Sequence, residues 1–378
     1  MLASDDPVGL TQQLVRLDTS AGDEDACTEP LASTLAAAGL EVSLVESGPR
    51  RNNLLARWRG GGSLVLSGHL DTVPFTEAGW AEHPLSGAVV GDRIYGRGTS
   101  DMKGGLAAMT SAACRAAREG APAFTLLFTI GEELGCQGAR DVLEHGPLPS
   151  NPVIVIGEST SNTLRFGHKG ATWLRLTSQG RAAHGSRPEL GSNAVLSLMR
   201  AVLALTDSFA PAHHAHLGLP TVNVGTFAGG VQPNIVPDAA KVELDFRTVP
   251  GLEHSDILSL VRSYGPDLRT ETMLNLAPVW TDPASAVSRH LKQVVDEVRQ
   301  GPPGEELAVS YFTDGCVLSA LPGSSVYICG PGDPDQPHTA DESCAVSRIY
   351  EAAAIYHRLI HSLSEVSRPG QLQAQGEP

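Results

Sequence analysis

Short apolar segments alternate with helix-like segments along the first part of the chain, and this alternation constrains the fold most. Segments 63–67, 124–130 and 152–156 are short, continuous apolar runs typical of buried strands. Segments 29–38 and 103–119 are typical of helices, the second being rich in alanine. Strands without polar alternation are covered on both faces, so the pattern predicts an α/β fold with helices on both sides of a sheet.

The pattern changes near residue 170. Val242, Leu244 and Phe246 alternate with charged residues, as a strand with one wet face requires. This stretch is expected to form an inserted α+β domain, after which α/β character returns. We therefore divide the chain into a first catalytic part, an insert, a second catalytic part and a disordered polar tail: residues 1–170, 171–280, 281–368 and 369–378.

Composition narrows the class of protein. The 378 residues exceed what one core usually organises, which favours two domains. The formal charge of −15 argues against nucleic acid or an anionic membrane as a partner. Six cysteines without a CxxC pair are interpreted as buried thiols. No export signal or membrane-spanning run is visible, so we expect a cytoplasmic protein.

Acids and imidazoles follow the predicted strands at the points where the strands end. His69 and Asp71 follow the first strand, Glu132 and Glu133 follow the second, and Glu158 follows the third. The carboxyl ends of parallel strands gather at one edge of a sheet, where ligands bind. We therefore expect these side chains to lie close together.

Two further residues belong with this set. Asp101 precedes a long predicted helix, and His338 follows a later strand in a Pro- and Gly-rich loop. Two imidazoles and three carboxylates suit zinc, and one bridging carboxylate would let them hold two ions with open positions for water. Asp71 is expected to accept the ring proton of His69. Of Glu132 and Glu133, one should ligate and the other should act as general acid and base.

Five ordered motifs carry a family resemblance that covers nearly the whole chain. SGHLDTVP, GRGTSDMKGG, GEELG, GES and PHTADE resemble the metal-binding segments of the acetylornithine deacetylase and succinyl-diaminopimelate desuccinylase family, with aminoacylases and glutamate carboxypeptidases as relatives. The segments 167–195 and 224–240 resemble the lid of that family. The resemblance implies a zinc-exopeptidase-like fold: a central mixed sheet covered by helices, with an inserted lid and dimerisation domain.

The resemblance assigns roles to these residues. It implies one zinc on His69, Asp101 and Glu158, and a second on His338, Asp101 and Glu133, with cobalt as a substitute metal. Glu132 would be the general acid and base, and Asp71 would orient His69. The peptide bond between Asp101 and Met102 is expected to be cis.

Residues for the substrate are assigned in the same way. His184 matches a histidine that helps hold the substrate carbonyl, in some members in the neighbouring subunit's site. Asn234 and Arg247 match positions tied to substrate polar groups. Thr313 lies in YFTDGC, which matches only loosely the segment that helps define the acyl group, and Glu158 precedes Ser-Thr where relatives often have Pro-Thr. Because of these two departures, the sequence does not identify the acyl group or the amino acid of the substrate.

Plainer interpretations stand beside these. Asp101 could be a helix N-cap, and Arg247 could be a strand-face arginine paired with Asp245 or Glu243. Lys103 is interpreted as an ordinary surface lysine. No GxSxG motif supports a serine hydrolase.

The sequence thus favours a zinc amidohydrolase that removes an N-acyl group from a small amino-acid substrate by metal-activated water attack on the amide carbonyl. A homodimer through the lid is expected from the resemblance. The alternatives are a dipeptidase or carboxypeptidase, a hydrolase that releases an amino acid from an acidic carrier protein, and a non-catalytic binding protein that retains the fold.

Overall fold

The chain forms two compact units in a computed structural model, which describes residues 5–209, 212–301, 304 and 306–366. The first unit comprises residues 1–167, 281–307 and 313–378, and the second comprises 168–280 and 308–312. The predicted tail 369–378 lies outside the described residues. The role of the insert as a lid stays a prediction.

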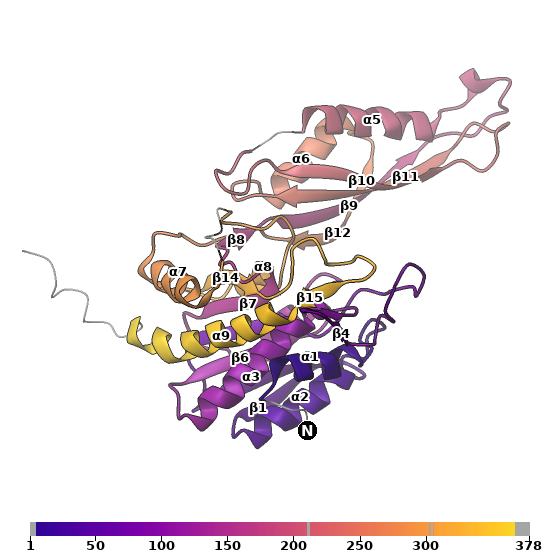
Figure 1. Cartoon of the computed structure of the whole chain (residues 1–378). Helices are drawn as coiled ribbons and strands as arrows, with labels where there is room; N and C mark the ends of the chain where they lie inside the picture. The colour runs from indigo at the N-terminus through magenta and orange to yellow at the C-terminus, as the bar shows by residue number, and fades with distance from the viewer. Residues whose placement is uncertain (1–4, 210–211, 302–303, 305, 367–378) are drawn as a thin grey trace, which may run out of the picture. The chain divides into compact units, whose positions relative to one another are not determined.

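A six-stranded mixed sheet forms the centre of the first unit (Figure 1). Four neighbouring strands run parallel, and two antiparallel strands extend one side. In spatial order, the strands are β1 (Glu41–Gly48), β2 (Arg51–Trp58), β6 (Phe124–Thr129), β3 (Leu64–His69), β7 (Val153–Ser159) and β14 (Ser325–Gly330). Residues of β3, β6 and β7 are buried throughout, as their unbroken apolar runs predict.

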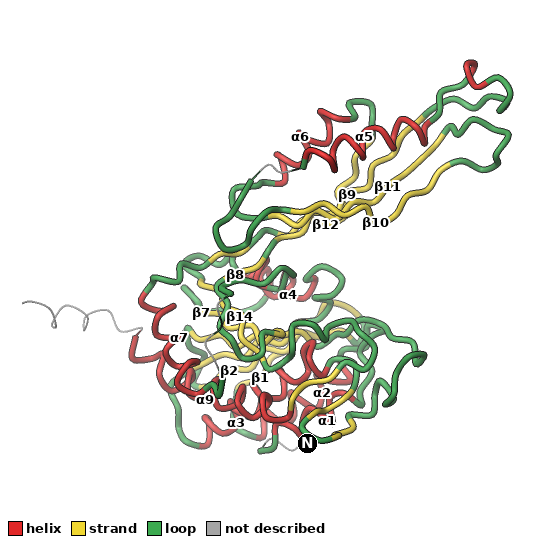
Figure 2. The backbone as a smooth tube through the Cα atoms, turned by 45° about the horizontal axis from the view of Figure 1, so that its top comes forward, coloured by secondary structure: helices red, strands yellow, loops and turns green. Residues whose placement is uncertain are grey.

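Helices cover this sheet on both sides. Figure 2 shows α4 on the opposite side of the sheet from α2, α3 and α9. The helices of this unit are α1 (Pro7–Val15), α2 (Asp25–Ala37), α3 (Gly104–Arg118), α4 (Gln137–His145), α7 (Ala286–Val298), α8 (Gly315–Leu318) and α9 (Val346–Val366). The α/β arrangement predicted from the sequence is therefore confirmed.

Shorter elements complete the first unit. A three-stranded sheet contains β4 (Ala88–Val90), β5 (Arg93–Tyr95) and β15 (Ser343–Ala345). The irregular turn η1 (Thr99–Lys103) precedes α3. At the points where the chain passes between units lie β8 (Gly167–His168) and β13 (Val279–Trp280).

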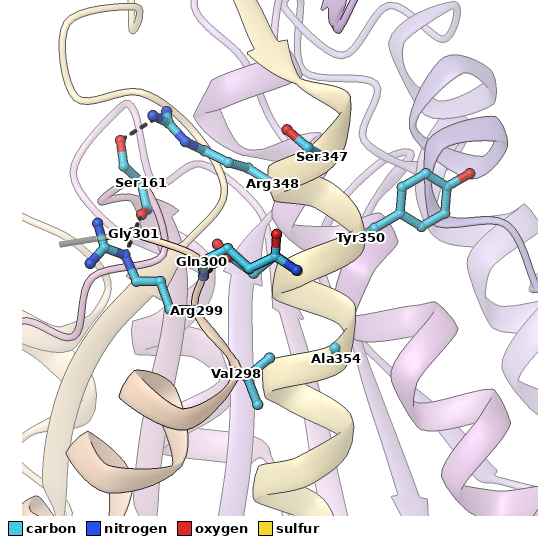
Figure 3. A pocket seen from close by; sticks show the side chains of 10 residues that line it. Ser161, Val298, Arg299, Gln300, Gly301, Ser347, Arg348, Tyr350 and Ala354 are labelled. Atoms are coloured by element: carbon cyan, nitrogen blue, oxygen red, sulfur yellow. Dashed lines mark hydrogen bonds between the residues drawn. The ribbon is translucent and has the colours of Figure 1, made fainter. Parts of the chain in front are cut away.

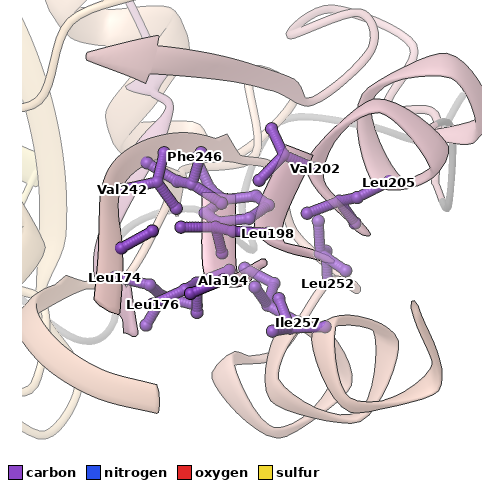
Figure 4. Close-up of a cluster of buried hydrophobic side chains, with 13 residues drawn as sticks. Leu174, Leu176, Ala194, Leu198, Val202, Leu205, Val242, Phe246, Leu252 and Ile257 are labelled. Atoms are coloured by element: carbon purple, nitrogen blue, oxygen red, sulfur yellow. The ribbon is translucent and has the colours of Figure 1, made fainter. Parts of the chain in front are cut away.

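The second unit is an antiparallel sheet covered by α5 and α6, which is an α+β arrangement. Its strands, in spatial order, are β10 (Thr221–Gly229), β11 (Ala239–Thr248), β9 (Gly170–Gln179) and β12 (Arg269–Leu276), and its helices are α5 (Ala194–Ser208), α6 (His254–Tyr264) and the short η2 (Pro188–Leu190). Figure 4 shows Leu198 of α5 and Ile257 of α6 among the sheet residues Leu174 and Phe246. The alternation seen in the sequence of β11 places its apolar side chains in this core.

Strand β3 packs against the side chain of Met102 in η1. A Cβ on Gly68 would lie 2.2 Å from Cε of Met102, so a larger residue would require the Met102 side chain to move. The backbone N–H of His69 faces Sδ of Met102 at 3.3 Å. The Asp101-Met102 bond is cis, as the resemblance implies.

The prediction of Lys103 as a surface lysine was wrong. Its side chain is buried and donates from Nζ to the Leu17 carbonyl at 2.6 Å.

The cysteine prediction is confirmed, because all six cysteines are buried and none is in a disulfide bond. Among the helices of the described part of the chain, none is both long and apolar enough to cross a membrane.

Candidate metal centre

His69 is the last residue of β3, and two carboxylates face its ring. Its Nε2 lies 2.9 Å from Oδ1 of Asp101 and 3.1 Å from Oε1 of Glu158. All three residues are buried. Asp101 comes from η1 and Glu158 from β7, the parallel neighbour of β3, so the sheet edge brings the three together.

His338 reaches the same place from the loop between β14 and β15. Its backbone is left-handed, with φ of 65°. The Nε2 atom lies 3.2 Å from Oε2 of Glu133 and 3.4 Å from Oδ2 of Asp101. The side chain of His338 is 55% exposed, so this half of the cluster is open to solvent.

Asp101 stands between the two imidazoles, with one carboxylate oxygen toward each. Ligand atoms of His69, Asp101 and Glu133 all lie within 4.8 Å of one another. In addition, Oε1 of Glu133 is buried without a hydrogen-bond partner, although such an atom normally has one. The donor atoms and this orphaned oxygen fit the binding of divalent cations.

The pKa values show how strongly these groups interact. Burial, followed by the neighbouring charge of Asp101, raises the pKa of Glu158 to about 7. Burial acts in the same direction on Asp101, but hydrogen bonds with His338 and His69 outweigh it and hold the Asp101 pKa well below its usual range. Buried carboxylates this close together need positive charge beside them. Cations bound at the cluster would supply it.

Asp71 acts differently from the sequence expectation. Nδ1 of His69 lies 3.0 Å from the backbone carbonyl oxygen of Asp71 and 3.6 Å from its carboxylate. The carboxylate instead accepts hydrogen bonds from the backbone N–H groups of Glu132 and Glu133, at 3.2 and 3.1 Å. Asp71 thus fixes both the ring of His69 and the Glu132-Glu133 segment, because its backbone and side chain bond separately.

Glu132 is buried beside the cluster. Burial raises its pKa well above the usual value; His69 opposes this rise, and Glu133 and Glu158 add to it. A carboxyl group with a raised pKa can both accept and return a proton near neutral pH. The chemistry available to Glu132 is therefore general acid and base catalysis.

Glu342 is a residue that sequence reasoning missed. Its Oε1 accepts hydrogen bonds from the backbone N–H groups of Ser100 and Asp101, at 2.9 and 3.1 Å. Its Oε2 accepts from Gly98 N–H and from Arg97. Glu342 ends the PHTADE motif, which was the available signal. Glu342 therefore fixes the turn that carries Asp101.

Asp101 is not the N-cap residue of α3, the plainer role considered for it; that residue is Lys103.

The predicted substrate residues lie apart from this cluster in the sequence, and three of them belong to the second unit. His184 is exposed and forms a β-bridge with Ile235, next to Asn234. Nε of Arg247 donates to Asp245 at 3.1 Å, the plainer pairing considered above, and its guanidinium lies over Phe312.

Thr313 belongs to the first unit and is buried. Its Oγ1 accepts a hydrogen bond from the Gly315 N–H at 3.0 Å. All four substrate assignments stay predictions.

A cavity of about 550 Å³ lies elsewhere, against α9. Figure 3 shows Arg348 donating to Ser161 and Arg299 beside them. None of the predicted site residues lines this cavity.

Comparison with known proteins agrees with the geometry. Residues 65–362 match the model of Peptidase family M20/M25/M40. The chain belongs to this family. It is 30% identical over 342 residues to the acetylornithine deacetylase of Vibrio cholerae, covering 87% of this chain and 89% of the relative. A peptidase M20 domain-containing protein of Schizosaccharomyces pombe is 29% identical, covering 95% and 85%.

Solved structures of M20 proteins share the fold. An M20 family metallo-carboxypeptidase from Sulfolobus solfataricus superposes with a TM-score of 0.82 at 19% identity, covering 94% of this chain and 99% of that one. A dinuclear metal binding peptidase of the M20 family from Bacillus subtilis gives 0.72 at 14% identity, covering 95% and 98%. As an M20 family member, the chain is a metal-dependent hydrolase that acts on amide bonds.

Replacing Glu342 should weaken metal binding at the M20 centre without touching a ligand. Glu342→Gln removes the charge that holds Arg97 and loosens the turn of Asp101, so affinity should fall about 10- to 100-fold. Equilibrium dialysis against zinc measures this, with Asp335→Asn in the same loop as the matched control. Equal affinities for the two variants would contradict the positioning role of Glu342.

Metal binding should release protons and strengthen as pH rises. Hydrogen bonds with Asp101 and Glu133 raise the pKa of His338 to about 10, so its imidazole is protonated at neutral pH before a cation binds. A cation must displace that proton, and affinity should rise at least about tenfold between pH 6 and 8. Calorimetric titration in buffers of different ionisation enthalpy counts the protons; a pH-independent affinity with none released would refute the expectation.

Proposed function

We propose that this enzyme removes an N-acyl group from an amino acid by hydrolysing the amide bond. One observation carries the proposal: two imidazoles face opposite oxygens of the buried carboxylate of Asp101, beside the buried acid Glu132. The acetylornithine deacetylases among its relatives, at about 30% identity, support this substrate class.

Two zinc ions are the proposed cofactors, with cobalt as a substitute. His69, Asp101 and Glu158 would hold one ion, and His338, Asp101 and Glu133 would hold the other. When bound, the pair would lower the pKa of a water molecule and polarise the amide carbonyl.

Glu132 performs the proton transfers in this proposal. It takes a proton from the water that attacks the carbonyl carbon, and it gives that proton to the amine nitrogen as the C–N bond breaks. Its raised pKa suits both steps. The hydrogen bond from the Glu132 N–H to Asp71 fixes the position from which its carboxyl group acts.

Residues of the second unit would complete substrate binding. His184 would donate to the substrate carbonyl oxygen, and Asn234 and Arg247 would bind its polar groups. The guanidinium of Arg247 can grip a carboxylate with two donors, provided that Asp245 releases it. Thr313 would contact the acyl group.

Two of the alternatives differ from this proposal in the substrate, and the third is a protein without catalytic activity. A dipeptide would use the same cluster, because the scissile bond is also an amide. An acidic carrier protein is less favoured, because the net charge of −15 on this chain would repel it. A non-catalytic binding protein would have no use for the buried, pKa-shifted Glu132.

Zinc-loaded and cobalt-loaded enzyme should be assayed against N-acetyl, N-succinyl and N-formyl amino acids, dipeptides and a carrier-bound amino acid. We expect turnover of a free acyl amino acid to exceed that of the other classes. Dipeptide or carrier-bound substrates turning over faster would select the corresponding alternative, and no turnover with full metal occupancy would select the binding protein.

Glu132→Ala should retain metal but lose turnover by about 100-fold or more, since proton transfer fails while all ligands remain. Asp101→Ala should lose both metal and activity, because it removes the bridge between the two sites. Metal analysis and initial rates on the same samples separate the two effects. A Glu132→Ala enzyme with near-normal turnover would remove Glu132 from the mechanism.

We also propose a cytoplasmic homodimer formed through the second unit. Strand β10 is an edge of its sheet, and eight of its nine residues are exposed. On α5, Leu196, Met199 and Leu203 expose apolar side chains on one face. Exposed edges and apolar stripes favour pairing with another chain. The six buried cysteines form no disulfide bond, which suits a reducing compartment.

Placing charge on that stripe should separate the subunits. Met199→Glu with Leu203→Glu should give a monomer by sedimentation, whereas Ser197→Glu, also exposed on α5, should leave the dimer intact. A wild-type protein that sediments as a monomer would refute the dimer.

A further inference from the structure

A second group of metal-ligating side chains lies on α9, apart from the centre described above. His357 and His361 are four residues apart, so they stand one helical turn apart on the same face. Figure 1 shows α9 alongside α3, whose C-cap residue is Glu119. Both imidazoles face the carboxylate of Glu119.

The two imidazoles converge on one carboxylate oxygen of Glu119. Nε2 of His357 lies 2.7 Å from Oε2 of Glu119, and Nε2 of His361 lies 3.3 Å from the same oxygen. One ligand atom from each of the three lies within 4.8 Å of the others. Nε2 of His361 is itself buried and makes no hydrogen bond of good geometry, so it is a buried donor or acceptor in need of a partner.

The distances from the two imidazoles to the carboxylate oxygen are close to those of a tetrahedral site. With metal–nitrogen bonds of about 2.0–2.1 Å, neighbouring ligand atoms in a tetrahedron are about 3.3 Å apart. His361 and Glu119 already have that separation, and His357 would move back by about half an ångström. The side chains are 18%, 34% and 41% exposed for His357, His361 and Glu119, which leaves room for water as a fourth ligand.

Arg115, in the last turn of α3, orients the carboxylate of Glu119. Nε of Arg115 donates to Oε1 of Glu119 at 2.9 Å and leaves Oε2 to the imidazoles. Outer partners of this kind orient the ligands of metal sites.

We propose that Glu119, His357 and His361 bind a further divalent transition-metal ion, of the zinc class, which clamps α9 to the end of α3. Two imidazoles and one carboxylate form a borderline donor set that prefers such ions to magnesium or calcium. Helix α3 has 15 residues and begins just after Asp101. Its length places the two sites about 22 Å apart, too far to share a ligand.

The plainer account is a hydrogen-bonded pair between His357 and Glu119 that needs no metal. It explains the 2.7 Å contact. It does not explain why the second imidazole points at the same oxygen without making a hydrogen bond, with its Nε2 buried. A cation between the three atoms accounts for both contacts.

Metal counting on the full-length protein tests the proposal. Wild-type protein, the double variant His357→Ala with His361→Ala, and the control His145→Ala are dialysed against the same free zinc concentrations, and bound zinc is measured per chain. His145 is an exposed helical histidine with one carboxylate nearby, at 3.9 Å. The double variant should hold about one ion fewer than the other two proteins.

A second background keeps this result separate from the proposed catalytic centre. In Asp101→Ala protein, the α9 site should still bind about one zinc ion, and adding the two histidine changes should abolish that binding. Copper substituted into the Asp101→Ala protein should give an electron paramagnetic resonance spectrum with nitrogen hyperfine splitting that the triple variant lacks. Neither readout depends on turnover.

The outcomes are decisive in both directions. Loss of one ion on the double change, with hydrolysis rates within about twofold of wild type, supports the site and shows that the variant is folded. Equal zinc counts for wild-type protein and the folded double variant up to about 100 μM free zinc would overturn it. Should the double variant fail to fold, Glu119→Gln, which keeps the shape of the side chain, should lower affinity at least about tenfold; an unchanged affinity would also overturn it.

Discussion

The carboxylate of Asp101 is the group on which the proposed centre depends. It is buried, and each of its oxygens faces an imidazole from a different part of the chain. Such a group is stable inside a protein only when positive charge or hydrogen bonds surround it. Glu158 and Glu133 add further negative charge beside Asp101. Cations bound at the cluster would compensate this charge.

The turn that carries Asp101 is held by groups that never touch the imidazoles. Glu342 ties three backbone N–H groups of this turn and is neutralised by Arg97, which is also buried. A buried ion pair of this kind contributes little net stability, but losing one partner is costly because the other charge is left alone. We therefore regard the pair as a device that positions the turn. Lys103 at the end of the same turn also holds it in position, because its buried ammonium group donates to the Leu17 carbonyl.

Much of the catalytic unit could be predicted from the sequence because each signal was local. Continuous apolar runs predicted the ends of β3, β6 and β7 to within a few residues, and the alanine-rich segment predicted both ends of α3 to within one residue. Strand ends then placed His69 and Glu158 side by side, since parallel neighbours end at one edge. Glu342 could not be found in this way, because its partners are backbone N–H groups more than 240 positions away. The use of the Asp71 carbonyl, rather than its carboxylate, depends on a backbone direction that residue types do not encode.

Gly68 has a consequence for substitutions beside the centre. With no side chain on this residue, the strand that ends in His69 packs against the side chain of Met102, the residue that follows Asp101. A larger residue at position 68 would have to push the Cε and Sδ atoms of Met102 aside. A change next to His69 would therefore be felt first by the neighbour of Asp101, although neither of these two residues had been altered.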